Sequence, residues 1–211
     1  MNRAPAYLLF DLDGTLVDSV PDLTLSLNLL RAELDCPPLS LEQTARMVGD
    51  GVTLLVQRAL GEKLYQEAHR TRFMEIYSEH LLDQTRCYPG ISALLQEHDP
   101  ERMAVITNKP YQLSRQLLEG LDLTRHFHTL IGGDSLPQRK PDPLPVLTAL
   151  DRLNAAAEQA VMIGDHHTDL AAGHGAGTAT CFCAYGIGCA NGQPSDYRVA
   201  ESTDLLNLFP G

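Results

Sequence analysis

Short apolar runs that end at polar or turn-forming residues divide the chain into predicted strands. Each run is rich in branched or aromatic residues and has the length of a buried strand. The predicted strands are Tyr7 to Phe10, Met103 to Thr107, Val161 to Gly164 and Thr178 to Cys183, with a weaker one at His128 to Ile131 and a possible edge strand at Tyr197 to Ala200. Helical patterns separate the later strands, for example Leu113, Leu117 and Leu121 after Pro110. Because strands and helices alternate, the pattern predicts a parallel α/β sheet.

The interval between the first two strands differs, because residues 21–83 show helical periodicity and no convincing strand. Leu23, Leu27, Leu30 and Leu34 share one helix face, and Ser40 with Gln43 matches a capping box. Further helices are predicted at Val52 to Leu60 and in a longer segment with Phe73, Ile76, Tyr77, His80 and Leu81 on one face. We therefore predict a sheet domain, residues 1–15 and 86–211, interrupted by an all-helical domain, residues 16–85.

Composition and charge limit the partners that this chain can bind. Its 211 residues suit one domain with an insertion, and 16 Lys and Arg against 27 Asp and Glu give a net charge of -11, which repels nucleic acids and anionic membranes. The longest stretch without Asp, Glu, Lys or Arg, Leu170 to Ser195, is too polar to span a bilayer. Five cysteines are an odd number, and the apolar run before Asp11 is too short for a signal peptide. We expect a cytoplasmic protein with no nucleic-acid or membrane partner.

Two carboxylates follow the first predicted strand. Asp11 and Asp13 stand at i and i+2 on an extended segment and so point to the same side, and Gly14 permits a sharp turn after them. This turn lies at the carboxyl end of the predicted strand, and ligands bind at the carboxyl ends of the strands in open parallel sheets. Two such carboxylates repel each other unless one is protonated or a cation lies between them. A solvated acidic turn is the structural alternative.

Polar groups also follow the other predicted strands. Thr107 and Asn108 can donate to a phosphate oxygen or cap a helix. Lys140 precedes two prolines, at 141 and 143, that stiffen its segment and could hold it in a fixed direction, although the segment can equally be a surface loop. Asp165 ends a further strand, with Asp169 one helical turn beyond it. Carboxylates on a rigid edge suit Mg²⁺, which binds a few of them together with water and a substrate phosphate.

These four segments resemble the haloacid dehalogenase superfamily, whose members are mostly phosphatases. The four motifs of that family occur here in order, as DLDGTL at 11–16, TN at 107–108, KPDP at 140–143 and GDHHTD at 164–169. The resemblance covers nearly the whole chain and implies a Rossmann-like parallel sheet core with the helical insertion as a cap domain. It also implies a Mg²⁺-dependent hydrolase of a small phosphorylated metabolite.

The resemblance assigns roles to the motif residues. Asp11 would attack phosphorus and form an aspartyl-phosphate, and Asp13, protonated when the first step begins, would donate a proton to the leaving alkoxide and later activate water. Mg²⁺ would be bound by Asp11, the backbone carbonyl of Asp13 and Asp165. Lys140 would offset the repulsion between nucleophile and phosphate, with Asp169 holding Lys140 or metal-bound water. Thr107 and Asn108 would grip the phosphoryl group.

The substrate is less sharply indicated than the chemistry. The segments at 48–52, 88–90 and 107–110 are similar to those of phosphoglycolate phosphatases, which implies 2-phosphoglycolate as substrate. Gly49 and Gly51 are the candidates for a cap loop that contacts the substrate, and Arg46 is a weaker one. A sugar-phosphate phosphatase or a phosphomutase of the same superfamily is the enzymatic alternative, and the sequence leaves open whether the protein is a monomer or a homodimer.

Two other interpretations have weaker support in the sequence. His166 and His167 beside Asp165 suggest a transition-metal hydrolase, but neighbouring histidines at a helix start are expected to point in different directions, so surface imidazoles are predicted. Cys181 and Cys183 are predicted to be buried thiols. A phosphoacceptor signalling module also uses an Asp cluster, a Thr and a Lys on a parallel sheet. The helical insertion and Asp13 argue against that module.

Overall fold

A parallel sheet occupies the centre of the protein. The computed structural model describes residues 5–211. Its strands are β1 (Tyr7–Phe10), β4 (Met103–Ile106), β5 (Thr129–Ile131), β6 (Ala160–Gly164), β7 (Ala179–Cys183) and β8 (Tyr197–Val199). They are ordered β5-β4-β1-β6-β7-β8, and every neighbouring pair is parallel. The predicted α/β class is confirmed, and the predicted strands are each found within one residue of the expected bounds.

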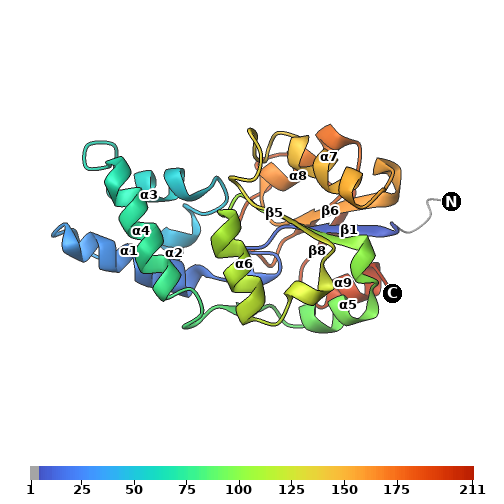
Figure 1. The fold of residues 1–211 in the computed structure, drawn as a ribbon, viewed down its shortest axis with the longest axis horizontal. Helices are drawn as coiled ribbons and strands as arrows, with labels where there is room; N and C mark the ends of the chain where they lie inside the picture. The colour runs from blue at the N-terminus through green and yellow to red at the C-terminus, as the bar shows by residue number, and fades with distance from the viewer. Residues whose placement is uncertain (1–4) are drawn as a thin grey trace.

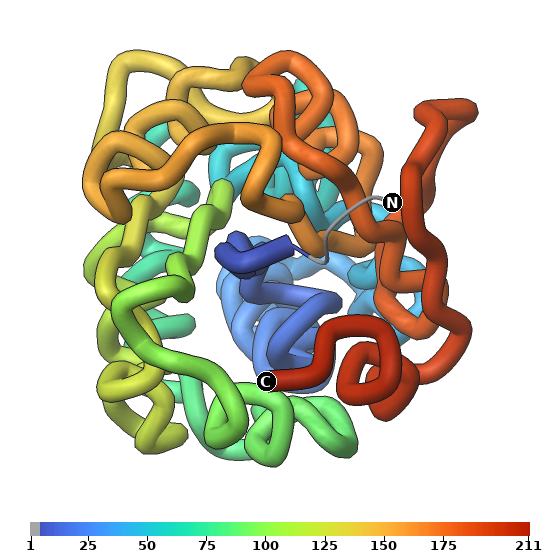
Figure 2. The backbone as a smooth tube through the Cα atoms, turned by 90° about the vertical axis from the view of Figure 1, so that its right-hand side faces the viewer, coloured from blue at the N-terminus to red at the C-terminus, as the bar shows by residue number. Residues whose placement is uncertain are grey.

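Alternating residues of the strands face two separate layers of helices. Leu8 and Phe10 belong to one apolar cluster and Leu9 to the other, as the two-residue period of a strand requires. The connecting helices are α5 (Ile91–Glu97), α6 (Tyr111–Gly120), α7 (Leu144–Arg152), α8 (His167–Ala176) and α9 (Asp204–Leu208), with 3₁₀ turns at Pro100–Arg102, Thr124–His126 and Ala157–Gln159. Figure 2 shows the blue N-terminal segment in the middle of the molecule, between green and red segments. This central position places the end of β1 at the middle of the sheet edge.

The helices of the insertion stand apart from the sheet, on the left in Figure 1. They are α1 (Val20–Glu33), α2 (Leu41–Ala45), α3 (Val52–Leu60) and α4 (Glu67–Glu79). The capping box at the start of α2 is confirmed, because Ser40 Oγ accepts from the Gln43 amide at 3.2 Å while the Gln43 side chain accepts from the Ser40 amide at 2.8 Å. The apolar residues Leu23, Leu27 and Leu30 of α1 are also buried, as expected for one helix face. The longer predicted helix, which included His80 and Leu81, extends beyond the observed one, because α4 ends at Glu79.

Two short connections join the insertion to the sheet. The sequence did not indicate the antiparallel ribbon of β2 (Val17–Asp18) and β3 (Arg86–Cys87) that they form. Beside it, the buried Asp22 carboxylate accepts hydrogen bonds from the Gln84 amide at 2.9 Å and from the Thr85 amide and hydroxyl at 2.8 and 2.7 Å. These bonds fasten the start of α1 to the returning chain. Among residues 5–211, no helix is long and apolar enough to cross a bilayer.

Candidate active site

The carboxyl ends of the central strands bring Asp11 and Asp165 together, although they are 154 positions apart in the sequence. Asp11 follows β1, and its amide donates to the Ile163 carbonyl of β6 at 2.9 Å. The turn at Gly14, with φ of +85°, passes so close to Asp165 that a Cβ there would lie 2.2 Å from Asp165 Oδ2. Glycine is therefore required at position 14 for this approach.

Lys140 connects two of the carboxylates. Its Nζ lies 2.9 Å from Asp11 Oδ1 and 2.6 Å from Asp169 Oδ1, and it donates to the Ile106 carbonyl at 2.5 Å. The side chain is almost wholly buried. Its three contacts fix the ammonium group beside Asp11, so that Lys140 is part of the site and not of a surface loop.

Asp165 is held by the segment that follows β7. Its Oδ2 accepts from the backbone amides of Ile187 at 2.9 Å and Gly188 at 2.7 Å, and its Oδ1 accepts from the Thr15 hydroxyl at 3.2 Å. These donors orient the carboxylate toward the end of β1 without neutralising its charge.

The buried cluster carries more negative than positive charge. Asp11, Asp165 and Asp169 face one ammonium group, that of Lys140. Burial and the Asp169 charge raise the pKa of Asp11 to about 6 despite Lys140, and burial and the Asp11 charge raise the pKa of Asp165 well above its usual range. Burial alone would lower the pKa of Lys140, but Asp11 and Asp169 reverse this and raise it. The excess negative charge favours binding of a cation.

The donor set fits a divalent cation that prefers oxygen. Asp11, Asp165 and Asp169 each offer a carboxylate oxygen, all within 4.8 Å of one another. Within residues 5–211, Asp11 Oδ1 has Lys140 Nζ as an ion-pair partner at 2.9 Å and no further partner. A cation at this point would add a second positive partner.

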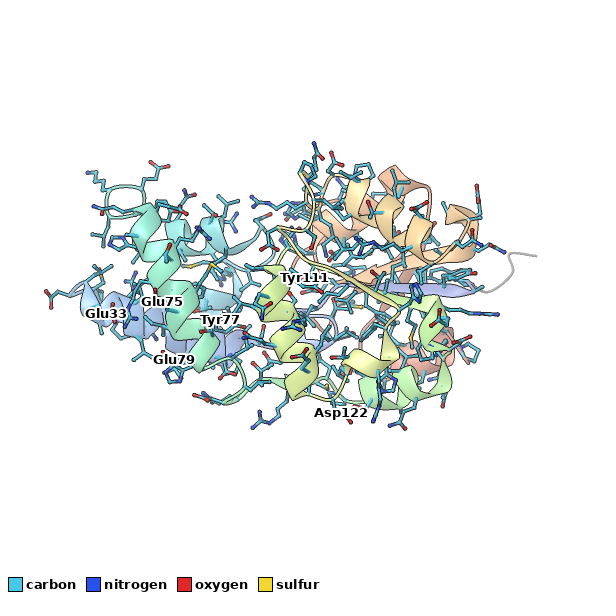
Figure 3. The ribbon with its side chains drawn as sticks, in the orientation of Figure 1. Glu33, Glu75, Tyr77, Glu79, Tyr111 and Asp122 are labelled. Carbon is cyan, nitrogen blue, oxygen red and sulfur yellow. The ribbon has the colours of Figure 1, made fainter. Side chains whose placement is uncertain are left out.

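The Asp13 side chain points away from this cluster, toward a lysine that the sequence analysis did not single out. Asp13 Oδ1 accepts from the Ser19 hydroxyl at 2.5 Å and from Lys109 Nζ at 3.0 Å. Lys109 also donates to the Tyr77 hydroxyl at 2.7 Å. Figure 3 shows Tyr77 on the side of α4 that faces α6. The side chain expected to donate a proton to the leaving group is thus bonded to Ser19 and Lys109.

Burial and neighbouring groups together determine the protonation of the Lys109 and Tyr77 pair. Burial raises the pKa of Tyr77 to about 12 although Lys109 opposes it. Burial acts to lower the pKa of Lys109, but Asp13 and Tyr77 outweigh it and raise the value. At neutral pH, Lys109 is therefore charged and Tyr77 neutral. The only sequence signal for Lys109 was its place in the segment 107–110.

Asn108 and Gly49 join the insertion to the sheet edge. Asn108 Nδ2 donates to the carbonyls of Gly49 and Lys140, each at 2.9 Å, so its amide group holds two loops together. The Thr107 hydroxyl accepts from the Lys109 amide at 3.1 Å. Thr107 and Asn108 lie beside Asp11 as expected, but the Asn108 amide hydrogens are already engaged.

A small cavity of about 50 Å³ lies between the sheet edge and the insertion. Its walls combine the polar residues Asp11, Asp13, Thr107, Asn108 and Lys109 with apolar side chains of α1, α3, α4 and α6, and Gly49 and Gly51 line it from the loop before α3. Arg46 does not take part, because its side chain is 77% exposed and paired with Glu42. Of the predicted site residues, Asp11, Asp13, Thr107, Asn108, Gly49 and Gly51 line this cavity, whereas Lys140, Asp165 and Asp169 lie behind Asp11 and do not.

The expectation of surface imidazoles at 166 and 167 is wrong for His166. Its ring is buried and packs against Gly49, where a Cβ would lie 2.8 Å from the His166 Cδ2. Burial, and next the neighbouring His167, lower the pKa of His166 to about 4. His166 has extended backbone angles, φ -119° and ψ 153°, before α8 begins, so the helical rule for neighbouring side chains does not apply. Cys181 and Cys183 are buried thiols as predicted.

Known proteins are similar to this chain along nearly its whole length. A family model described as haloacid dehalogenase-like hydrolase matches residues 8–183. A phosphoglycolate phosphatase of Chromobacterium violaceum is 38% identical over 210 residues, which are 95% of this chain and 94% of that protein. A phosphoglycolate phosphatase of Rhodospirillum rubrum is 42% identical over 86% of this chain and 80% of its own.

A solved structure extends the comparison to three dimensions. The crystal structure of a predicted phosphoglycolate phosphatase from Haemophilus somnus matches with a TM-score of 0.87 at 30% identity, covering 96% of this chain and 97% of the other. The family model, the relatives and the solved structure therefore agree with one another. The chain belongs to the haloacid dehalogenase-like hydrolases and is a phosphatase of that family.

Proposed function

We propose that the protein is a Mg²⁺-dependent phosphomonoester hydrolase that acts on 2-phosphoglycolate through an aspartyl-phosphate intermediate. The observation that carries the proposal is the buried Asp11 carboxylate, 2.9 Å from the ammonium group of Lys140 and beside Asp165. A nucleophile, a fixed positive charge and an acidic cation site at one point suit phosphoryl transfer, whose transition state spreads negative charge over oxygen.

Asp11, Asp165 and the backbone carbonyl of Asp13 would hold Mg²⁺. When bound, the ion offsets the negative charge of nucleophile and phosphate and polarises a phosphoryl oxygen. Lys140 adds a second positive charge and is oriented by Asp169. Both reduce the repulsion that an anionic nucleophile meets at an anionic phosphate.

The Asp11 carboxylate would form a bond to phosphorus while the bond from phosphorus to the ester oxygen breaks. Asp13 would donate a proton to the departing alkoxide and then accept one from the water that hydrolyses the intermediate. For the first step, Asp13 has to reach the departing alkoxide, so its contact with Lys109 has to loosen when substrate enters. A second anionic group on the substrate, drawing Lys109 toward itself, would have this effect.

This second anionic group is the argument for 2-phosphoglycolate, which carries a carboxylate beside its phosphate. Lys109 is the basic residue that lines the cavity. Relatives with 35 to 42% identity are named phosphoglycolate phosphatases, which supports the same substrate here. The insertion would act as a cap, with residues 16–85 as cap and residues 1–15 and 86–211 as core, and the five free cysteines suit a cytoplasmic enzyme.

Turnover of a panel of phosphomonoesters tests the substrate. With Mg²⁺ present, we expect kcat/KM to be highest for 2-phosphoglycolate and lower for sugar phosphates. A preference for a sugar phosphate would contradict this substrate assignment and favour the alternative phosphatase. Conversion of one sugar phosphate into its isomer without phosphate release would instead identify a mutase.

Replacing Lys109 with methionine tests the carboxylate contact. We expect the ratio of kcat/KM for 2-phosphoglycolate to that for ethyl phosphate, which lacks the carboxylate, to fall about 10- to 100-fold, since a hydrogen bond to a charged group contributes about 1.5–3 kcal/mol. Tyr77→Phe is the control, because it removes a partner of Lys109 and retains the charge. An unchanged ratio in Lys109→Met would remove Lys109 from substrate recognition.

Thermal unfolding at two pH values tests the cation site. The raised pKa of Asp11, about 6 against an ordinary 3.8, means that the metal-free folded protein binds this proton more tightly than the unfolded chain. Its stability therefore falls as pH rises from about 4 to 6. Because Mg²⁺ binds the ionised carboxylates, we expect it to raise Tm more at about pH 7.5 than at about pH 5. Equal shifts at both pH values would contradict the site.

A further inference from the structure

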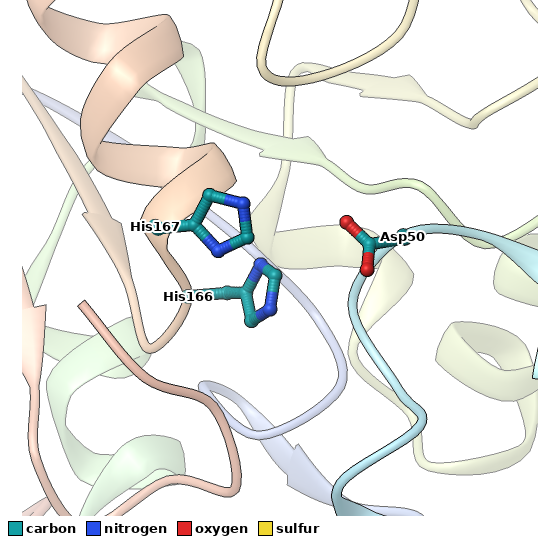
Figure 4. A group of neighbouring side chains, drawn as sticks. All are labelled: Asp50, His166 and His167. Carbon is teal, nitrogen blue, oxygen red and sulfur yellow. The ribbon is translucent and has the colours of Figure 1, made fainter. Parts of the chain in front are cut away.

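A second group of metal-binding side chains lies outside the carboxylate cluster. Asp50 belongs to the loop before α3, and His166 and His167 stand at the start of α8. Figure 4 shows both imidazole rings beside the Asp50 carboxylate. One potential ligand atom of each residue lies within 4.8 Å of the others, and the ring centroids are 4.1 Å apart. The insertion and the sheet domain thus each contribute to the group.

Each imidazole ring is oriented through its Nδ1 atom. His166 Nδ1 lies 3.0 Å from the Thr168 hydroxyl, and His167 Nδ1 lies 3.1 Å from the side-chain amide of Asn191. The Thr168 amide lies 3.5 Å from His166 Nδ1 and donates to it when the ring carries its proton on Nε2. Metal binding needs the other tautomer, with the Nδ1 proton donated to the Thr168 hydroxyl and, at His167, to the Asn191 amide turned to present oxygen. Within the described part of the chain, neither Nε2 atom has a hydrogen-bond partner. Histidine ligands of metals are held in this way, with one nitrogen bonded to the protein and the other free.

The surroundings leave room for one cation. Arg58 Nη2 lies 2.5 Å from Asp50 Oδ2, which leaves Oδ1 available to a metal. The group opens into a hollow lined also by Arg46, Ile187 and Asn191, so an ion can enter from solvent. The arginines face the hollow and oppose a bound cation, which therefore has to be held by direct bonds to nitrogen and oxygen and not by the general field.

We propose that Asp50, His166 and His167 form a site for a divalent transition-metal ion of the Zn²⁺ class. Two imidazole nitrogens and one carboxylate oxygen suit Zn²⁺, whereas Mg²⁺ prefers oxygen alone. Bond lengths of about 2.0–2.1 Å place tetrahedral ligands about 3.3 Å apart, so the three side chains must close by about 1.5 Å or less. Three protein ligands leave the fourth position to water.

Such an ion would join the insertion to the sheet domain next to the cavity. Asp50 lies between Gly49 and Gly51, which both line the cavity, and His166 directly follows Asp165. Binding would hold the loop of residues 48–51 against the start of α8. On the proposed function, this restricts opening of the cap, so Zn²⁺ is expected to slow turnover at saturating Mg²⁺.

Calorimetric titration with Zn²⁺ tests the site without relying on activity. In excess Mg²⁺, the wild-type protein is expected to bind one more Zn²⁺ per chain than His167→Ala or Asp50→Asn. The Zn²⁺ affinity of this additional site is expected to fall more than about 100-fold in each variant. Even the loss of a residue that only supports a metal ligand lowers the affinity about 10- to 100-fold. His128→Ala is the matched control, because His128 Nδ1 pairs with Glu101 at 2.8 Å and, among residues 5–211, His128 belongs to no group of three metal-binding side chains. It should bind as wild type.

The exposed thiol of Cys189 is a competing ligand in the same hollow, so Cys189→Ser belongs to the experiment. Retained binding in Cys189→Ser and a Co²⁺ spectrum without a thiolate band support the proposed ligands. Wild-type binding in both His167→Ala and Asp50→Asn, or loss of binding only in Cys189→Ser, would overturn the proposal. Neither result depends on phosphatase activity, so a failure here leaves the proposed function standing.

Discussion

Replacing Asp11 with asparagine is expected to lower kcat by roughly 10⁴-fold or more, because it removes the nucleophile with almost no change in volume. The same change removes a cation ligand, so excess Mg²⁺ should not restore activity. The measurement is phosphate release from 2-phosphoglycolate under single-turnover and steady-state conditions. Turnover within tenfold of wild type at saturating Mg²⁺ would contradict a covalent intermediate on Asp11.

The fold of the Asp11→Asn variant gives the control for this result. Burial and Asp169 already disfavour the ionised Asp11 carboxylate, so its loss should leave the chelator-treated protein at least as stable as wild type. Asp18→Asn is the matched variant, since Asp18 lies on β2 and bonds only locally to the Val20 amide. It should retain wild-type activity.

Replacing Lys140 with methionine is expected to lower kcat by about 100- to 1000-fold at saturating Mg²⁺, the usual effect of losing one fixed positive group at a transition state. It should also destabilise the protein by about 3–5 kcal/mol, because Asp11 and Asp169 lose their shared buried partner. Urea unfolding and steady-state kinetics measure the two effects. Wild-type kcat in this variant would remove Lys140 from the reaction.

A double variant separates the two roles of Lys140. In Lys140→Met with Asp169→Asn, one of the unpaired charges is gone, so part of the lost stability should return while kcat stays low. Lys63→Met controls for the loss of one positive charge at an exposed position. Recovery of kcat in the double variant would mean that Lys140 acts only through stability.

Sequence patterns predicted the sheet and the carboxylate cluster well, for a physical reason. Buried parallel strands are continuous apolar runs, and the residue after each run lies at the same edge of the sheet. Asp11, Thr107 and Asp165 could therefore be placed together without knowing the path of the chain between them. The contact between Lys140 and Asp11 depends on a loop, and for it the family resemblance gave the stronger indication.

Contacts between the insertion and the sheet could not be predicted in this way. Lys109 meets Tyr77 and Asp13 across 32 and 96 positions, and no periodicity relates a residue on α4 to a loop after β4. Asp50 and the two histidines also come together only through the relative position of the insertion and the sheet domain, which sequence periodicity does not predict. Side-chain direction at His166 also depended on one extended residue before α8, which a helical pattern does not reveal.

Local charge at the sheet edge resolves an apparent conflict with the net charge of -11. Lys140 and Lys109 are both buried next to the cavity, and a bound cation would add to them. Interactions at about 3 Å with little intervening water outweigh the screened field of distant carboxylates. An acidic protein can therefore bind an anionic ester at this one point.

Trapping the phosphoryl group on the protein tests the aspartyl-phosphate intermediate itself. Wild-type protein would be mixed with phosphorus-labelled 2-phosphoglycolate and Mg²⁺, quenched in acid during turnover and cleaved into peptides. We expect label on Asp11 that disappears in a chase with unlabelled ester and is absent when a chelator replaces Mg²⁺. Label on another residue, or label that stays on Asp11 through the chase with no phosphate released, would contradict it, the second result favouring a phosphoacceptor module.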